Sequence, residues 1–126
     1  MKKALYIQNS LSSSNLLEAK NVAIALQLNS YDYKSILDSE FNENLNYLDY
    51  SIILIDQLAF NCKGLSKALE IETRLRDSKN ADVILTKSNV LTKNEKRLLI
   101  DSNIILMTKP LLATSLARKI NSLDKA

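Results

Sequence analysis

The sequence predicts an α/β fold: a five-stranded parallel sheet flanked by five helices. Short apolar runs of strand length recur along the chain, and segments with apolar residues at helical spacing separate them. Strands that alternate with helices form a parallel sheet covered on both faces and joined by right-handed crossovers. The 126 residues are enough for one such unit, so we expect a single domain over residues 1–126.

Five segments carry the strand signal. They are residues 4–7, 31–37, 50–55, 82–85 and 104–107. The third segment is apolar on both faces, as expected for a strand at the centre of a parallel sheet. The second is polar enough to lie at an edge.

Helices are predicted between these strands and after the last one. The segments are 15–28, 40–48, 65–77, 92–100 and 112–123. Asn15 with Glu18 and Thr92 with Glu95 have the spacing of capping boxes, which mark helix starts. The 40–48 segment has the weakest pattern. Residues 57–63 are predicted to form a loop that ends at Gly64.

Polar residues finish three of the predicted strands. Asp56 follows the third strand, Thr86 ends the fourth, and Lys109-Pro110 follows the fifth. The carboxyl ends of parallel strands meet at one edge of an open sheet, where such folds bind ligands. The sequence therefore predicts a pocket that holds an acid, a hydroxyl and an ammonium group.

The composition excludes several other classes of protein. The net charge is +3, and the basic residues are spread along the chain, so direct nucleic-acid binding is not indicated. No apolar run approaches the ~20 residues of a membrane span, and we expect a cytoplasmic protein. One cysteine excludes an intramolecular disulfide, and the absence of histidine removes the commonest general base.

With this order of elements, the strand-end residues resemble those of receiver domains of two-component response regulators. These have a flavodoxin-like fold with strand order 2-1-3-4-5. The resemblance covers the whole chain and implies that Asp56 stands at the phosphoacceptor position. Gly64, Thr86 and the Lys109-Pro110 pair also have the family's spacing. In such a pocket the lysine neutralises phosphoryl oxygens and the hydroxyl donates a hydrogen bond to one of them.

The sequence departs from the receiver pattern at the metal site. Receivers carry an acidic pair after the first strand to hold Mg²⁺, and Gln8 and Asn9 stand there instead. Neutral amides bind Mg²⁺ far less well than carboxylates, and phosphoryl transfer depends on the metal. Asp56 is then the only carboxylate expected in the pocket. We therefore expect no cofactor, with Mg²⁺ binding at most weak and phosphorylation severely weakened.

Other positions also depart from the family. Lys87 replaces a small residue after Thr86 and is long enough to reach over the pocket, while Leu106 replaces the aromatic switch residue. Leu58 and Phe60 stand two and four residues after the aspartate, where Phe60 replaces a proline. The signalling relay is therefore incomplete, and Asp56 is expected to form an ion pair with Lys109, joined by Lys87.

These features predict an atypical receiver-like signal-transduction domain rather than an enzyme. It would act through protein-protein contacts, largely without phosphorylation, either alone or as the N-terminal part of an orphan response regulator with an output domain. Receivers commonly use the fourth helix, fifth strand and fifth helix as a partner face, so a homodimer through that face is expected. There the apolar stripe of residues 112–123 serves the core, and Arg97, Arg118 and Lys119 face acids of a neighbour.

Two alternatives stay open. Asp56 could accept a phosphoryl group with weak Mg²⁺ binding. Alternatively, the chain could be a flavodoxin-like ligand-binding protein or a carrier similar to the IIB proteins of sugar phosphotransferase systems, because the polar loop 8–14 precedes a helix. The IIB proteins need a cysteine after the first strand, where Gln8 or Asn9 stands.

Overall fold

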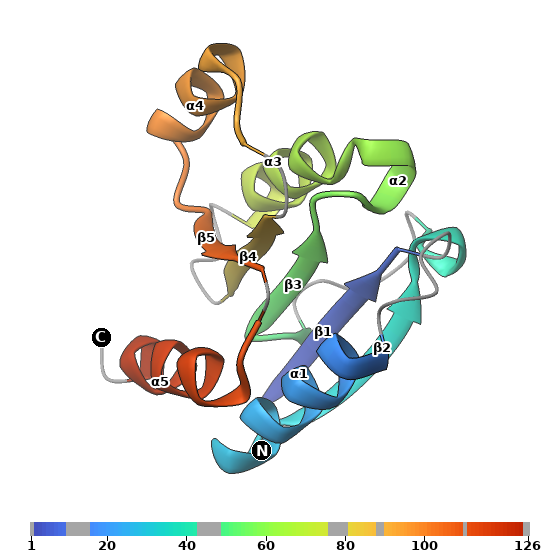
Figure 1. Cartoon of the computed structure of the whole chain (residues 1–126), viewed down its shortest axis with the longest axis vertical. Helices are drawn as coiled ribbons and strands as arrows, with labels where there is room; N and C mark the ends of the chain where they lie inside the picture. Colours follow the sequence, from blue (N-terminus) through green and yellow to red (C-terminus); the bar gives the residue numbers. More distant parts are fainter. Residues whose placement is uncertain are drawn as a thin grey trace.

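The five strands form one parallel sheet in the order β2-β1-β3-β4-β5 (Figure 1). The computed structural model describes residues 2–9, 16–42, 49–75, 81–87, 90–109 and 111–124. The strands are β1 (Lys3–Gln8), β2 (Asp32–Leu37), β3 (Ile52–Asp56), β4 (Asp82–Lys87) and β5 (Ile105–Thr108). The predicted fold class and strand order are confirmed, with the most apolar strand, β3, at the centre.

Helices follow β1, β3, β4 and β5, and β3 is followed by two of them. They are α1 (Leu16–Leu28), α2 (Ala59–Cys62), α3 (Gly64–Leu75), α4 (Lys93–Ile100) and α5 (Ala113–Asp124). The Thr92 capping box at the start of α4 is present. Thr92 Oγ1 accepts from the Glu95 amide at 3.1 Å, and the Thr92 amide donates to Glu95 Oε1 at 2.9 Å.

Two hydrophobic cores lie on opposite faces of the sheet, because successive strand residues point to opposite sides. On one face, Tyr6 and Leu54 pack with residues of α1 and α5 such as Leu26 and Leu116. On the other face, the adjacent strand residues pack against α3. That second cluster includes Leu5, Ile7, Ile53, Ile55, Leu65, Ala68 and Ile71.

The helix predicted over 40–48 is wrong in its described part. Asp38–Glu40 form a single 3-10 turn, and Phe41 already has an extended backbone. A local and a tertiary interaction favour this ending: the Leu37 amide donates to Glu40 Oε1, and the Phe41 ring packs edge-on against Phe60. Residues 43–48 lie outside the described part of the chain.

The segment 57–63, which was predicted to be a loop, contains a short helical turn. In this turn, α2, Phe60, Asn61 and Cys62 all have φ near +60°. Left-handed backbone at non-glycine residues is uncommon and is maintained by its surroundings. Here the Phe60 amide donates to Asp38 Oδ2 at 2.8 Å, and the Lys67 ammonium lies over the rings of Phe41 and Phe60.

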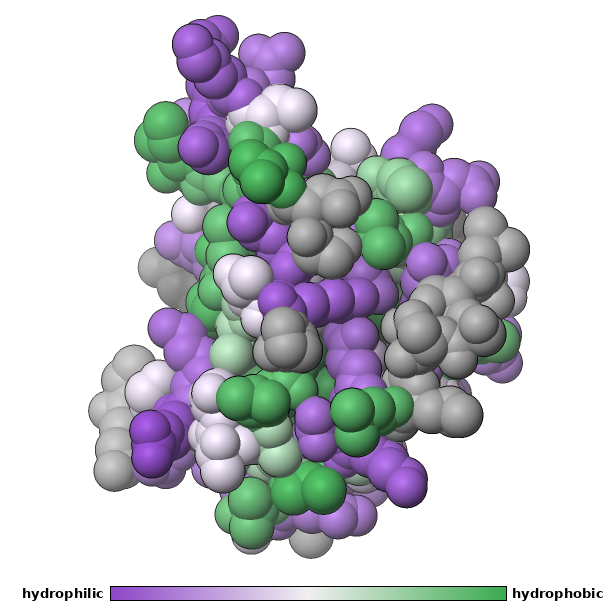
Figure 2. Space-filling view, in the orientation of Figure 1, coloured by the Kyte–Doolittle hydropathy of each residue, from purple (hydrophilic) through white to green (hydrophobic). Residues whose placement is uncertain are grey.

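Helix α4 contributes no buried residue. Leu98 and Ile100 on α4 and Leu106 on β5 are exposed, and Figure 2 shows hydrophobic side chains over this side of the molecule. The predicted apolar stripe of α5 is buried at Leu116 and Ile120, whereas Leu112 just before the helix is exposed. Within the described ranges, no helix combines the length and hydropathy needed to span a membrane.

Candidate functional site

The sheet register brings the predicted strand-end residues to one edge. Asp56 on β3 lies opposite Thr86 on β4, and Lys87 lies opposite Thr108 at the end of β5. The Lys109 amide continues this pairing by donating to the Lys87 carbonyl at 2.8 Å. The side chains of Asp56 and Lys109 can therefore meet although 53 positions separate them in the sequence.

Both carboxylate oxygens of Asp56 are bonded inside the protein. Oδ1 accepts from the Leu58 amide at 2.9 Å, and Oδ2 accepts from Lys109 Nζ at 2.7 Å. The Asp56 side chain is only 1% exposed. An ionised group at this depth needs such partners, because an unpaired buried charge is costly.

A second carboxylate lies in the pocket, so the expectation that Asp56 is its only carboxylate is wrong. Glu18 Oε2, from the first turn of α1, lies 3.2 Å from Lys109 Nζ. One ammonium group therefore joins acids from α1 and β3. The capping partner predicted for Glu18, Asn15, lies outside the described residues. The spacing that predicted a cap gave no signal that α1 turns Glu18 toward the sheet edge.

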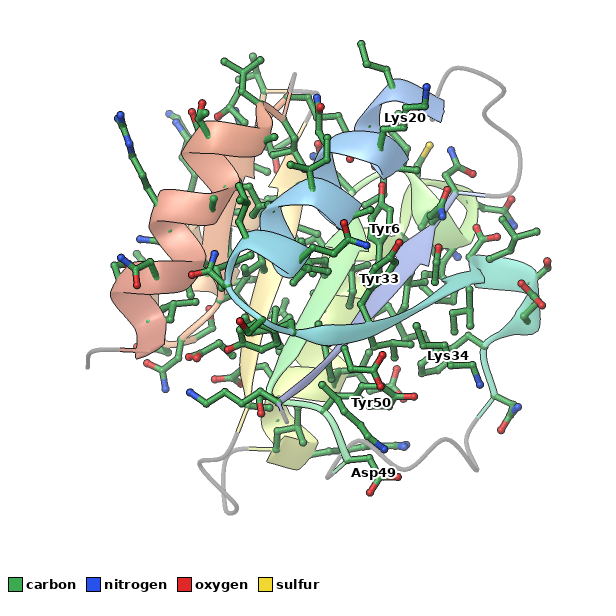
Figure 3. The ribbon with its side chains drawn as sticks, turned by 90° about the horizontal axis from the view of Figure 1, so that it is seen from below. Tyr6, Lys20, Tyr33, Lys34, Asp49 and Tyr50 are labelled. Carbon is green, nitrogen blue, oxygen red and sulfur yellow. The ribbon has the colours of Figure 1, made fainter. Side chains whose placement is uncertain are left out.

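The pocket also contains two buried oxygen atoms with no hydrogen-bond partner in the described structure. They are Tyr6 Oη on β1 and Glu18 Oε1. The Tyr6 hydroxyl lies close enough to the Glu18 carboxylate for a hydrogen-bond interaction that shifts both pKa values, although it does not have the geometry of a well-formed hydrogen bond. Figure 3 shows Tyr6 and Tyr33, from neighbouring strands, on the side of the sheet that α1 covers.

The ionisable groups perturb one another. Burial raises the pKa of the Glu18 carboxyl, and the ammonium of Lys109 offsets this only in part. Burial lowers the pKa of Lys109, but the hydrogen bonds and charges of Asp56 and Glu18 outweigh it and raise the pKa above its usual value. Burial, with the charges of Glu18 and Asp56, raises the pKa of the Tyr6 hydroxyl. Lys109 is therefore held firmly in its charged form.

The raised pKa of Glu18 predicts a pH-dependent difference between the wild type and Glu18→Gln. A raised pKa in the folded state means that folding favours protonated Glu18. The contribution of Glu18 protonation to the free energy of unfolding is complete below the pKa of Glu18 in the unfolded chain, near 4.5. It is lost as the pH rises through the higher pKa of Glu18 in the folded protein. The free energy of unfolding of the wild type, minus that of Glu18→Gln, should therefore fall as the pH rises above 4.5. Urea unfolding of both proteins across this range measures it. A difference that grows with pH would contradict the assignment.

The other predicted pocket residues have different roles in the structure. The Thr86 side chain is fully buried, and its hydroxyl donates to the Ile55 carbonyl at 3.5 Å rather than to the Asp56 carboxylate. Gln8 Nε2 donates to Ser35 Oγ on β2, which directs this amide away from Asp56. Asn9 is buried beside the end of β1. Asp56 makes its hydrogen bonds and ion pair with Leu58 and Lys109, so the prediction that Lys87 joins this ion pair is wrong in the described structure.

Some predicted features lie outside the described residues. These are Pro110, which follows Lys109, and most of the polar loop 8–14, from Ser10 onward. Cys62, in the left-handed turn after β3, is exposed.

Receiver domains are among the solved structures that are similar to this chain. One, a response regulator receiver domain protein from Methanospirillum hungatei, has a TM-score of 0.71 at 16% identity, with 99% of this chain and 95% of that chain covered. The receiver domain of the Francisella response regulator 1452 has a TM-score of 0.66 at 23% identity, with 99% and 98% covered.

A third similar structure contains a partner protein. It is the receiver domain of the Saccharomyces cerevisiae response regulator Ssk1, crystallised with the histidine phosphotransfer protein Ypd1. Its TM-score is 0.65 at 14% identity, with 95% of this chain and 86% of that chain covered. No family model and no curated protein sequence matches the chain. The sheet order, the crossover helices and these structural neighbours together show that the chain has the fold of response-regulator receiver domains.

Proposed function

We propose that this chain is a receiver-like signal-transduction domain that acts through protein-protein contacts without phosphorylation of Asp56. The observation that carries the proposal is the engagement of both Asp56 oxygens, on a side chain that is 1% exposed. Phosphoryl transfer requires the attacking oxygen to lie in line with the donor phosphorus. Asp56 would have to leave Lys109 or the Leu58 amide before it could take that position.

The pocket residues also fit poorly to the Mg²⁺ ion that the receiver fold implies. Mg²⁺ prefers an octahedral shell of carboxylate and water oxygens. Gln8 at the family's acidic position is bonded to Ser35, while Asp56 and Glu18 both face the ammonium group of Lys109. No group of three or more acidic or cysteine side chains in the described ranges is arranged to hold a metal ion. We therefore propose that Mg²⁺ binds weakly at most.

The proposed contact surface is the side of the molecule formed by α4, β5 and α5. Leu98, Ile100 and Leu106 are exposed there, and clustered apolar residues on a surface are typical of protein contact sites. Leu99 of α4 packs against the core, whereas the exposed side chains of Leu98 and Ile100 are available to pack against a partner. The partner would be an output domain, a separate protein or a second copy of this chain.

Incubation with Mg²⁺ and acetyl phosphate, followed by intact mass measurement, tests the proposal. We expect no stoichiometric mass gain and no change in oligomeric state on size-exclusion chromatography. Asp56→Asn is the control, because it removes the acceptor oxygen with little change in side-chain volume. A gain of one phosphoryl group that disappears in Asp56→Asn would overturn the proposal and support a phosphoaccepting receiver.

A further inference from the structure

Lys109 and the two carboxylates form a cluster that joins three elements of the fold. Lys109 follows β5, Asp56 ends β3, and Glu18 lies in the first turn of α1. Lys109 Nζ is 2.7 Å from Asp56 Oδ2 and 3.2 Å from Glu18 Oε2. Because both acids contact the same atom, they lie close enough together to share a single ion.

The cluster offers more oxygen atoms than the ammonium group uses. Glu18 Oε1 and Tyr6 Oη are buried in the pocket near each other, and neither makes a well-formed hydrogen bond in the described structure. Unsatisfied buried oxygens are rare in folded proteins and need a physical explanation. The two carboxylates that contact the Lys109 cation are oxygen donors of the kind that hard metal ions prefer.

We propose that the Lys109 ammonium is the resident cation of a two-carboxylate site built from Glu18 and Asp56, and that it excludes Mg²⁺ from that site. This inference rests on the proposed function, because it assumes that Asp56 is not phosphorylated. Glu18 is then the positioning residue, because it holds Lys109 over Asp56 from the side of the pocket that α1 covers. A divalent ion would have to displace the ammonium group, and two cations this close repel each other strongly.

Removal of the lysine should therefore create a metal site. In Lys109→Met, the two carboxylates lose their shared counter-ion while the apolar stem is kept. We expect Mg²⁺ to bind this variant more tightly than the wild type, by roughly tenfold or more, in isothermal titration calorimetry. The melting temperature should rise with Mg²⁺ concentration for the variant alone, because a ligand that binds only the folded state stabilises it.

Two controls separate this mechanism from a general charge effect. Lys87→Met removes the same charge from the same sheet edge without touching Asp56 or Glu18, and should behave like the wild type. Adding Glu18→Gln to Lys109→Met removes one of the two carboxylates and should abolish most of the gained affinity. Should Lys109→Met fail to fold without metal, recovery of its circular dichroism on addition of MgCl₂ is the expected result.

Three outcomes would overturn the inference. The first is a wild type that binds Mg²⁺ as tightly as Lys109→Met. The second is a gained affinity that survives Glu18→Gln, and the third is a Lys109→Met variant that gains neither affinity nor stability from Mg²⁺. No phosphoryl donor is present in these titrations. A failure here is therefore distinct from a failure of the proposed function, which would appear as a mass gain on Asp56.

Discussion

Replacement of Gly64 with alanine is expected to destabilise the protein by about 3 kcal/mol or more. An added Cβ would lie 2.1 Å from the Asp56 carbonyl oxygen and 2.8 Å from that of Gln57. Both atoms belong to the backbone, so no side-chain rotation relieves the contact. The Gly64 amide also donates to the Gln57 carbonyl at 3.1 Å, which keeps the two segments together.

Urea unfolding of Gly64→Ala and the wild type measures this loss. The matched control is Ser66→Ala on the exposed side of the same helix, for which we expect a change within about 0.5 kcal/mol. Comparable stability of Gly64→Ala and the wild type would show that β3 and α3 can separate without cost. In that case the close approach would not explain the glycine.

Lys109→Met is expected to cost about 3 kcal/mol in the absence of metal, because removal of one partner leaves buried charges uncompensated. The side chains of Lys109, Glu18 and Asp56 are 17%, 11% and 1% exposed, so water replaces little of the lost interaction. Thermal and urea unfolding in a buffer with chelator measure this cost.

A neutral version of the whole cluster separates charge from packing. The triple variant Glu18→Gln, Asp56→Asn and Lys109→Met should recover most of the stability that Lys109→Met loses, because no unpaired charge remains. Lys87→Met should stay within about 0.5 kcal/mol of the wild type. If the triple variant is no more stable than Lys109→Met, the lysine contributes through packing of its alkyl chain rather than through its charge.

Most of the fold could be predicted from the sequence because its signals are local. The apolar run at 50–55 marked the central strand, and the Thr92 capping box marked the start of α4. The prediction failed at 40–48. There the weak helical pattern was overridden by contacts with residues distant in the sequence, such as the packing of Phe41 against Phe60.

The pocket was predicted only in part. The strand ends located Asp56, Thr86 and Lys109 at one edge, since parallel strands share a carboxyl edge whatever their loops do. The sequence contained no comparable signal for Glu18, whose position in a capping box suggested a local role. Nor could it predict that the Thr86 hydroxyl is bonded to the Ile55 carbonyl, because that choice depends on the strand register.

The sequence by itself therefore determined the order of the elements and the residues at the sheet edge, through hydrophobic periodicity and strand-end chemistry. Only the tertiary structure decided which groups share the pocket. The rotation of α1 about its axis places Glu18 beside Lys109, and the buried Asp56 carboxylate takes its partners from the residue after β5 and from the turn after β3. Such contacts depend on distances between atoms far apart in the chain, which local patterns do not encode.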